Sequence, residues 1–191
     1  MRRSKEETAE TRRRIIETAA REFRTHGIAG VGIAELMARS ELTHGGFYRH
    51  FASKDALAAE ACRAALGETT GQIAAAADKA PQGRGLETVL RRYLNKLHRD
   101  TPEKGCSLAA IGSEAARGDG DVRAAMTEGY LSLVATVRRQ LTGLPAAEAE
   151  DRALAIVAGM IGCLTMARLV DDEDLSNRIL RAGRQHLAGS G

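Results

Sequence analysis

The stretch LTHGGFYRHFASKDAL, residues 42–57, carries most of the information about the fold. Its aromatic residues Phe47, Tyr48 and Phe51 are spaced for neighbouring turns of one helix, which predicts a short helix ending near His50. Four of the six aromatic residues of the chain precede residue 52. The N-terminal region is therefore expected to be built differently from the rest.

Two further helices are predicted before that stretch. Apolar residues at positions i, i+4 and i+8 predict an amphipathic helix over about residues 8–26, and Gly27 stands where a left-handed cap would end it. Apolar residues within 33–37 mark a short second helix, and residues 41–43 form a turn. A short helix, a three-residue turn and a second short helix, supported by a preceding helix, make a helix-turn-helix arrangement.

The remainder of the chain is also predicted to be helical. Ser53 is an N-cap signal for a long helix over about residues 54–79, and Pro81, Pro102 and Pro145 separate the later segments. Apolar periodicity predicts further helices over about residues 86–97, 106–117, 121–141, 148–170 and 175–187. We expect an all-α fold of about nine helices, with a helix-turn-helix domain over 1–53 and a helical domain over 54–191.

Charge is distributed unevenly along the sequence. Residues 1–54 hold 11 Lys and Arg against 7 Asp and Glu, so the whole positive excess of the chain, +3, lies in its first quarter. A local basic excess favours a polyanionic partner such as DNA. The arginines at 2–3 and 12–14 fit either a solvated face or a basic arm that follows the minor groove.

Several classes of protein are disfavoured by composition. The longest uncharged apolar run, 153–167, is shorter than a membrane span. The three cysteines are an odd number at wide spacings, which fits free thiols in a reducing cytoplasm. No residue pattern suggests a metal site, a cofactor loop or a nucleophile with its base. We therefore expect a cytoplasmic protein that is not an enzyme, needs no cofactor and has no membrane partner.

The predicted second helix of the helix-turn-helix unit, with its flanks, offers polar groups to a DNA major groove and its phosphates. Hydroxyl, imidazole, guanidinium and ammonium groups all donate hydrogen bonds to phosphate oxygens or base edges, and glycine allows close approach. The expected DNA-binding residues are Thr43, His44, Gly45, Tyr48, Arg49, His50 and Lys54.

The same residues carry a family resemblance. The stretch 11–57 resembles the DNA-binding domain of the TetR family of bacterial transcriptional regulators, whose pattern contains Tyr-x-His-Phe followed after two residues by Lys. Tyr48, His50, Phe51 and Lys54 match this pattern in place. The resemblance implies a dimeric regulator that binds a double-stranded DNA operator and responds to a small-molecule effector.

Three positions depart from the family pattern. Glu41 stands where a turn glycine is usual, Met37 where alanine is common, and Gly32 where a Ser or Thr commonly caps the second helix. The resemblance further implies a C-terminal helical domain that binds the effector and dimerises through its last two long helices. The segment GCSLAAIGSEAARGD, 105–119, is similar to one seen in a subgroup of these regulators.

An effector cavity is expected among the C-terminal helices, where core and pocket would use the same apolar stripes. A modest apolar or amphipathic ligand is expected there, with tyrosine hydroxyls as donors. The expected lining residues are Leu90, Tyr93, Leu97, Cys106, Leu108, Ile111, Met126, Tyr130 and Val134.

A homodimer interface is expected on the apolar helix near the C-terminus and on the last helix. Small residues recur every four positions on one face, so that another helix can approach closely, from a second copy or from within the chain. The expected interface residues are Ala155, Gly159, Cys163, Ala167 and Ile179.

The main expectation is a repressor that a small apolar or amphipathic ligand releases from a near-palindromic operator, and two alternatives remain beside it. Cys106 begins a helix, whose dipole would lower the thiol pKa, so a regulator of the same fold could sense oxidants or electrophiles. A buried cysteine that packs as a small apolar residue is the competing interpretation of Cys106. The other alternative is a helical binding protein or enzyme whose N-terminal domain no longer binds DNA.

Overall fold

The computed structural model describes residues 5–118 and 120–189, and over this part of the chain it contains helices and no strand. The predicted all-α fold is confirmed. The elements are α1 (Lys5–His26), α2 (Ile33–Arg39), the 3-10 helix η1 (His44–Arg49), α3 (Lys54–Asp78), α4 (Gly85–Tyr93), α5 (Lys96–Asp100), the 3-10 helix η2 (Pro102–Lys104), α6 (Ser107–Ala115), α7 (Gly120–Arg138), α8 (Ala146–Leu169) and α9 (Glu173–Gly189).

Two helices differ from their sequence-based predictions. The segment after residue 43 forms a 3-10 helix, and Thr43 makes no side-chain capping bond. The segment 86–97, expected as one helix, breaks after Tyr93, and the side chain of Asn95 accepts a hydrogen bond from His98 N to start α5. Glycines at 45 and 46 disfavour an α-helix after residue 43. The Asn95 cap starts a new helix, so the helix expected over 86–97 is divided in two.

The turn between α2 and η1 contains a left-handed residue. Glu41 has φ 58°, and its N–H donates to Ala38 O at 2.9 Å. Left-handed backbone strains a residue that has a Cβ, which accounts for the glycine that is usual at this position in the family pattern.

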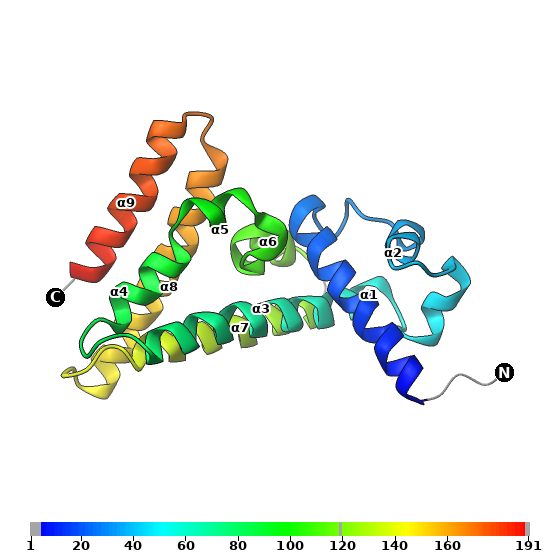
Figure 1. Ribbon diagram of the computed structural model, residues 1–191, viewed down its shortest axis with the longest axis horizontal. Helices are drawn as coiled ribbons and strands as arrows, with labels where there is room; N and C mark the ends of the chain where they lie inside the picture. Colours follow the sequence, from blue (N-terminus) through cyan, green and yellow to red (C-terminus); the bar gives the residue numbers. More distant parts are fainter. Residues whose placement is uncertain (1–4, 119, 190–191) are drawn as a thin grey trace.

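A pair of long helices forms the centre of the molecule (Figure 1). Helices α3 and α7 lie side by side, with α1 and α2 at one end and α8 and α9 at the other. Gly129 of α7 allows the close approach, because a Cβ there would lie 2.4 Å from Leu66 Cδ1. The central pair thus connects the N-terminal helices to the C-terminal ones.

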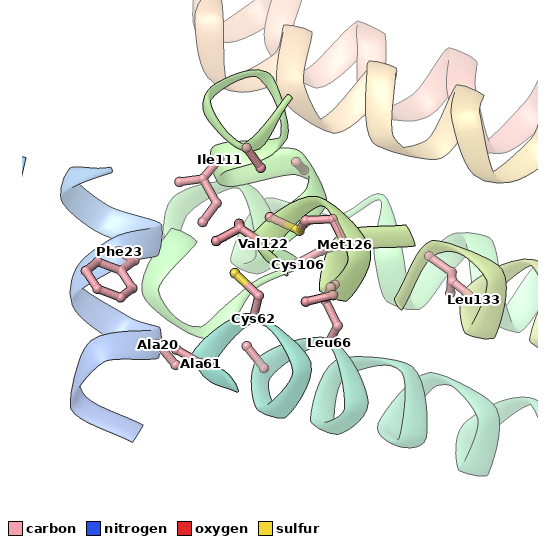
Figure 2. Packing of buried hydrophobic residues seen from close by; sticks show 14 of the residues in the cluster. Ala20, Phe23, Ala61, Cys62, Leu66, Cys106, Ile111, Val122, Met126 and Leu133 are labelled. Atoms are coloured by element: carbon pink, nitrogen blue, oxygen red, sulfur yellow. The ribbon is translucent and has the colours of Figure 1, made fainter. Parts of the chain in front are cut away.

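The hydrophobic core continues across the predicted domain boundary. Figure 2 shows Phe23 of α1 near Cys62 of α3, with Ile111 of α6 and Val122 of α7 on the same cluster. All four side chains are buried. Because α1 packs directly on the C-terminal helices, movement of those helices can reach the N-terminal region. The division into 1–53 and 54–191 stays a prediction.

The small-residue stripe of α8 packs against α9 of the same chain. A Cβ on Gly159 would lie 2.8 Å from Leu187 Cδ2, and a Cβ on Gly183 would lie 2.8 Å from Cys163 Sγ. The hydroxyl of Ser176 donates to Ala167 O at 2.6 Å. Close helix approach therefore occurs within one protomer at these positions.

A second apolar face of α8 stays exposed, and we call it the outer stripe. Its spacing places its members on one side of the helix. By length and composition α8 could cross a membrane, and 33% of its most apolar window is buried. Apolar helices that pack in the core of soluble proteins meet the same criteria. The outer stripe consists of Ala155, Ala158, Gly162, Met166 and Leu169.

Candidate nucleic-acid interface and ligand cavity

Buried aromatic residues hold the predicted DNA-binding segment in place. Phe47 is fully buried and Phe51 nearly so, and their ring centroids lie 5.8 Å apart. Tyr48 meets Phe47 edge to face at 5.2 Å, yet 65% of its surface is exposed. One side of η1 thus anchors the segment, while the other presents polar groups to solvent.

The structure brings the seven predicted DNA-binding residues together on η1 and its flanks. The residues at 43, 44, 45, 48 and 49 are exposed, and His50 and Lys54 are half-buried. Ser53 caps α3 by accepting a hydrogen bond from Ala56 N at 3.0 Å. Lys54 therefore stands at a helix N-terminus, where orphan N–H groups add to its attraction for phosphate.

Arg12 is a positioning residue that the sequence interpretation missed. Its guanidinium lies 4.7 Å above the ring of Phe51 and forms an ion pair of 2.5 Å with Glu60 of α3. It ties α1 to the segment that follows η1. Arg13 pairs with acids of its own helix, while the arginines at 2–3 lie outside the described residues.

Glu114 of α6 joins the C-terminal helices to the N-terminal domain. Its carboxylate accepts hydrogen bonds from Ile28 N at 2.9 Å and Ala29 N at 2.6 Å. Gly27, with φ 78°, lies so close that a Cβ would be 2.8 Å from a Glu114 oxygen. The turn after α1 is thus held by a carboxylate more than eighty residues away in sequence.

Replacing Glu114 by Gln is expected to loosen this joint. The amide keeps one acceptor oxygen, so one backbone N–H loses its partner, at a cost of about 2 kcal/mol in unfolding free energy. Urea unfolding and amide hydrogen exchange at Ile28 and Ala29 measure the effect. Glu87→Gln, at an exposed ion pair, is the control and is expected to change stability by less than about 0.5 kcal/mol. Unchanged protection at both amides would contradict the role of Glu114.

A cavity of about 1120 Å³ lies between the N-terminal domain and the C-terminal helices. Helix α1 forms one wall, α3 the second, and the end of α4 with α5 and η2 the third. The lining comprises Ala9, Arg12, Arg13, Ile16, Glu17, Ala20, Arg21, Arg24, Ala64, Ala65, Glu68, Thr69, Gln72, Ile73, Arg92, Asn95, Leu97, His98, Thr101, Glu103 and Lys104.

Of the nine residues predicted to line an effector cavity, Leu97 alone lines this one. The hydroxyl of Tyr130 donates to Leu154 O at 3.0 Å, so that it already has a partner inside the chain. The side chains of Leu90, Tyr93, Cys106, Ile111, Met126 and Val134 are buried in the core, against which Leu108 and Tyr130 pack.

Burial governs the chemistry of Cys106. Only 1% of the residue is exposed, and burial raises the pKa of its thiol. The Tyr93 hydroxyl and the backbone N–H groups of the first turn of α6 act in the opposite direction but do not reverse the shift. The lowered pKa expected for a helix N-terminus is therefore not found, because desolvation outweighs the helix dipole.

His98 connects α5 to the start of α6. Its Nε2 accepts a hydrogen bond from Cys106 N at 2.9 Å, and its Nδ1 lies 2.7 Å from Tyr93 O. This arrangement requires a neutral ring that is protonated on Nδ1. Burial, with smaller contributions from the charges of Arg168 and Arg24, lowers the His98 pKa to about 4.

Two family models match the chain. The model described as bacterial regulatory proteins of the tetR family matches residues 15–61. The model described as the C-terminal domain of LmrA/YxaF-like transcriptional regulators matches residues 83–180, which is more than half of the chain. The two matches together cover the N-terminal region from residue 15 onward and most of the C-terminal helices.

Individual proteins with a similar sequence or fold agree with these matches. The transcriptional regulator TtgR of Pseudomonas putida is 38% identical over 78 residues, which make up 41% of this chain and 37% of that relative. A TetR-family regulator from Cytophaga hutchinsonii has a TM-score of 0.80 at 22% identity, covering 99% of this chain and 98% of its own. The reduced form of E. coli NemR has a TM-score of 0.79 at 19% identity, covering 93% and 95%.

The solved structures at these identities show a shared fold, and the family models supply the assignment. The resemblance predicted from Tyr48, His50, Phe51 and Lys54 is confirmed, since the first model spans all four residues. Regulators of this kind are soluble DNA-binding transcription factors and not enzymes. The chain belongs to the TetR family of bacterial transcriptional regulators.

Proposed function

We propose that the chain is a cytoplasmic, homodimeric transcriptional repressor that a small amphipathic ligand releases from a near-palindromic operator. One observation carries the proposal: α1, which packs on α2 and contacts Phe51 after η1 through Arg12, is also a wall of the cavity. A ligand that changes the spacing between α1 and α3 would move the DNA-binding segment. Release then follows if the ligand binds better to the state whose recognition segments no longer match the operator.

Selection of bound duplexes from a random DNA pool tests the DNA-binding part of this proposal. The selected duplexes are then titrated by fluorescence anisotropy at several salt concentrations. We expect a near-palindromic sequence, bound at least about 1000-fold more tightly than scrambled DNA, as for specific regulators. Enrichment of no sequence, with only steeply salt-dependent binding, would contradict a specific regulator and favour a domain that has lost operator recognition.

The outer stripe of α8 is the proposed centre of the dimer interface. Met166 is 44% exposed and Leu169 is 72% exposed, and Leu175 at the start of α9 continues this apolar surface at 42%. A two-fold axis beside α8 and α9 would cover these side chains with their counterparts from a second copy. The proposed interface keeps Ala155 from the sequence-based prediction, whereas Gly159 and Cys163 pack against α9 of the same chain.

Met166→Glu is expected to separate the dimer, because two carboxylates would face an apolar interface near the two-fold axis. We expect the dimer dissociation constant to rise by about a hundredfold or more. Light scattering coupled to gel filtration measures the mass. Leu131→Glu, at an exposed leucine of α7, is the matched control and is expected to stay dimeric. A Met166→Glu variant with dimeric mass at micromolar concentration would place the interface elsewhere.

Oxidation of Cys106 is the alternative input. The fold likeness to the reduced form of NemR is the observation in its favour. Against it stand the burial of Cys106 and its raised thiol pKa, both of which slow attack by the thiolate on an oxidant. A Cys106→Ser variant whose operator complex still dissociates with peroxide or quinones would rule this input out.

A further inference from the structure

The cavity between α1, α3 and the α5–η2 segment has an uneven charge balance. Arg12 is neutralised by Glu60, and Arg13 by acids of its own helix. Among the described residues, the other basic lining residues form no ion pair with a carboxylate; these are Arg21, Arg24, Arg92 and Lys104. They face two further lining acids, Glu68 and Glu103. A positive excess therefore remains on the cavity wall.

Arg24 is the buried member of this group. Its Nε donates to Ala20 O at 2.8 Å and its Nη1 donates to Gly105 O at 2.7 Å. These two bonds fix the plane of the guanidinium, and they use neutral carbonyls rather than a carboxylate. The residue is 8% exposed and lines the cavity. Its charge is thus partly desolvated, and burial lowers its pKa even though the charges of Glu68 and Glu103 act in the opposite direction. The guanidinium is pre-oriented without forming an ion pair with either carboxylate.

The lining also includes apolar residues on three of its helices. Ile16 of α1, Ile73 of α3 and Leu97 of α5 line the cavity, together with alanines of α1 and α3. Leu97 is 72% exposed, so that a bound molecule would cover it. His98, with a pKa of about 4, adds no charge at neutral pH. A ligand that fits these walls has an apolar body and a negative head group.

We propose that this cavity, at the junction of the two regions, binds an amphipathic organic anion whose head group pairs with Arg24. A carboxylate suits the planar guanidinium, and a phosphate monoester offers the same oxyanion chemistry. Because Arg24 also holds Gly105, the residue before Cys106 and α6, binding there would pull on the segment that leads to Glu114. Its role as the effector site rests on the proposed function, whereas anion binding itself does not.

The test uses the full chain without DNA and a fluorescent amphipathic anion, 1-anilinonaphthalene-8-sulfonate. Decanoate, decyl phosphate, decanol and decyltrimethylammonium then compete with the probe at fixed salt and below their micellar concentrations. We expect the two anions to displace the probe at about tenfold lower concentration than decanol, with the cation weakest. The two anions, compared with each other, distinguish a carboxylate from a phosphate ligand. If decanol and the cation displaced the probe at the same concentrations as the two anions, the proposal would be overturned.

Variants locate the site. Ala64→Trp places a large side chain into the cavity from α3 and is expected to weaken probe binding at least about tenfold. Ala75→Trp, about three turns further along α3, is exposed and outside the cavity, so that it should bind as the parent does. Equal binding by these two variants would place the probe elsewhere and overturn the proposal.

Charge variants test the head-group pairing. Arg24→Gln is expected to remove most of the advantage of the anions over decanol. Since Arg24 also supports the fold, Arg92→Gln at the rim provides a second variant, with the adjacent, non-lining Arg91→Gln as its control. The assignment is supported if the advantage of the anions over decanol becomes smaller in Arg92→Gln and stays unchanged in Arg91→Gln. Equal effects of the two substitutions oppose it. If the parent protein bound no operator, the proposed function would be wrong. These titrations contain no DNA, so they would still show whether the cavity binds an anion.

Discussion

Replacing both Tyr48 and Lys54 by alanine is expected to weaken operator binding by about a thousandfold or more. Each change removes a phosphate contact, typically about 1–2 kcal/mol, and a two-fold dimer loses each contact twice. The slope of log affinity against log salt should become shallower by about 2, because one cationic contact disappears per half-site. Anisotropy titration of the selected duplex provides both quantities.

Folding should survive this double substitution. Tyr48 is largely exposed, and the buried anchors of the segment are Phe47 and Phe51. The melting temperature is therefore expected to stay within about 2 °C of that of the parent. Arg91→Ala, a loss of positive charge on α4, is the control for a non-specific charge effect and should leave operator affinity unchanged. An unaltered affinity in the double variant would remove η1 from the DNA interface.

The stability of the chain is expected to fall as the pH is lowered from about 6.5 to about 4, because of His98. In the unfolded chain this imidazole has its ordinary pKa near 6.5, whereas in the folded chain its pKa is about 4. Between these values the unfolded state binds a proton that the folded state does not, so acidification favours unfolding. Complete protonation would cost up to about 3 kcal/mol.

The hydrogen bonds of His98 explain the direction. A protonated ring has no lone pair on Nε2 to accept the Cys106 N–H, and its charge would add to those of Arg168 and Arg24. Urea unfolding at pH 7, 5.5 and 4.5 measures the loss, with His98→Gln as the variant expected to lose this part of the pH dependence. His186→Gln, on the exposed side of α9, should retain it. Identical profiles for the parent and His98→Gln would contradict the assignment.

Local signals explain why the helix-turn-helix region could be predicted from sequence. The spacing of Phe47, Tyr48 and Phe51 and the cap at Ser53 act within a few residues, so that the sequence itself records them. Leu97 illustrates the limit of this reasoning. It belongs to an apolar stripe only if one helix runs through 86–97, and the break at Leu94 turns it towards the cavity instead.

Contacts between residues far apart in the chain could not be predicted from the sequence in the same way. Glu114 accepts hydrogen bonds from backbone N–H groups, which every residue except proline possesses. The residue types at Ile28 and Ala29 therefore do not indicate the contact. The stripe with Gly159 and Cys163 indicated close helix packing. Small residues are required whether the neighbouring helix belongs to the same chain or to a second copy, so the sequence does not distinguish the two. The cavity depends on where α1 meets α5 and η2, which periodicity does not determine.

The bond between Glu114 and the turn after α1 bears on how such regulators could be recombined. A chimaera that takes residues up to the end of α2 from another regulator keeps the carboxylate from this chain and supplies a foreign turn. Because the carboxylate recognises main-chain N–H groups, the donor's side chains at 28 and 29 are not part of the joint. Gly27 is the exception, since its φ of 78° and the nearby carboxylate leave no room for a Cβ. To keep this joint, a donor module therefore needs a glycine at 27 and residues other than proline at 28 and 29.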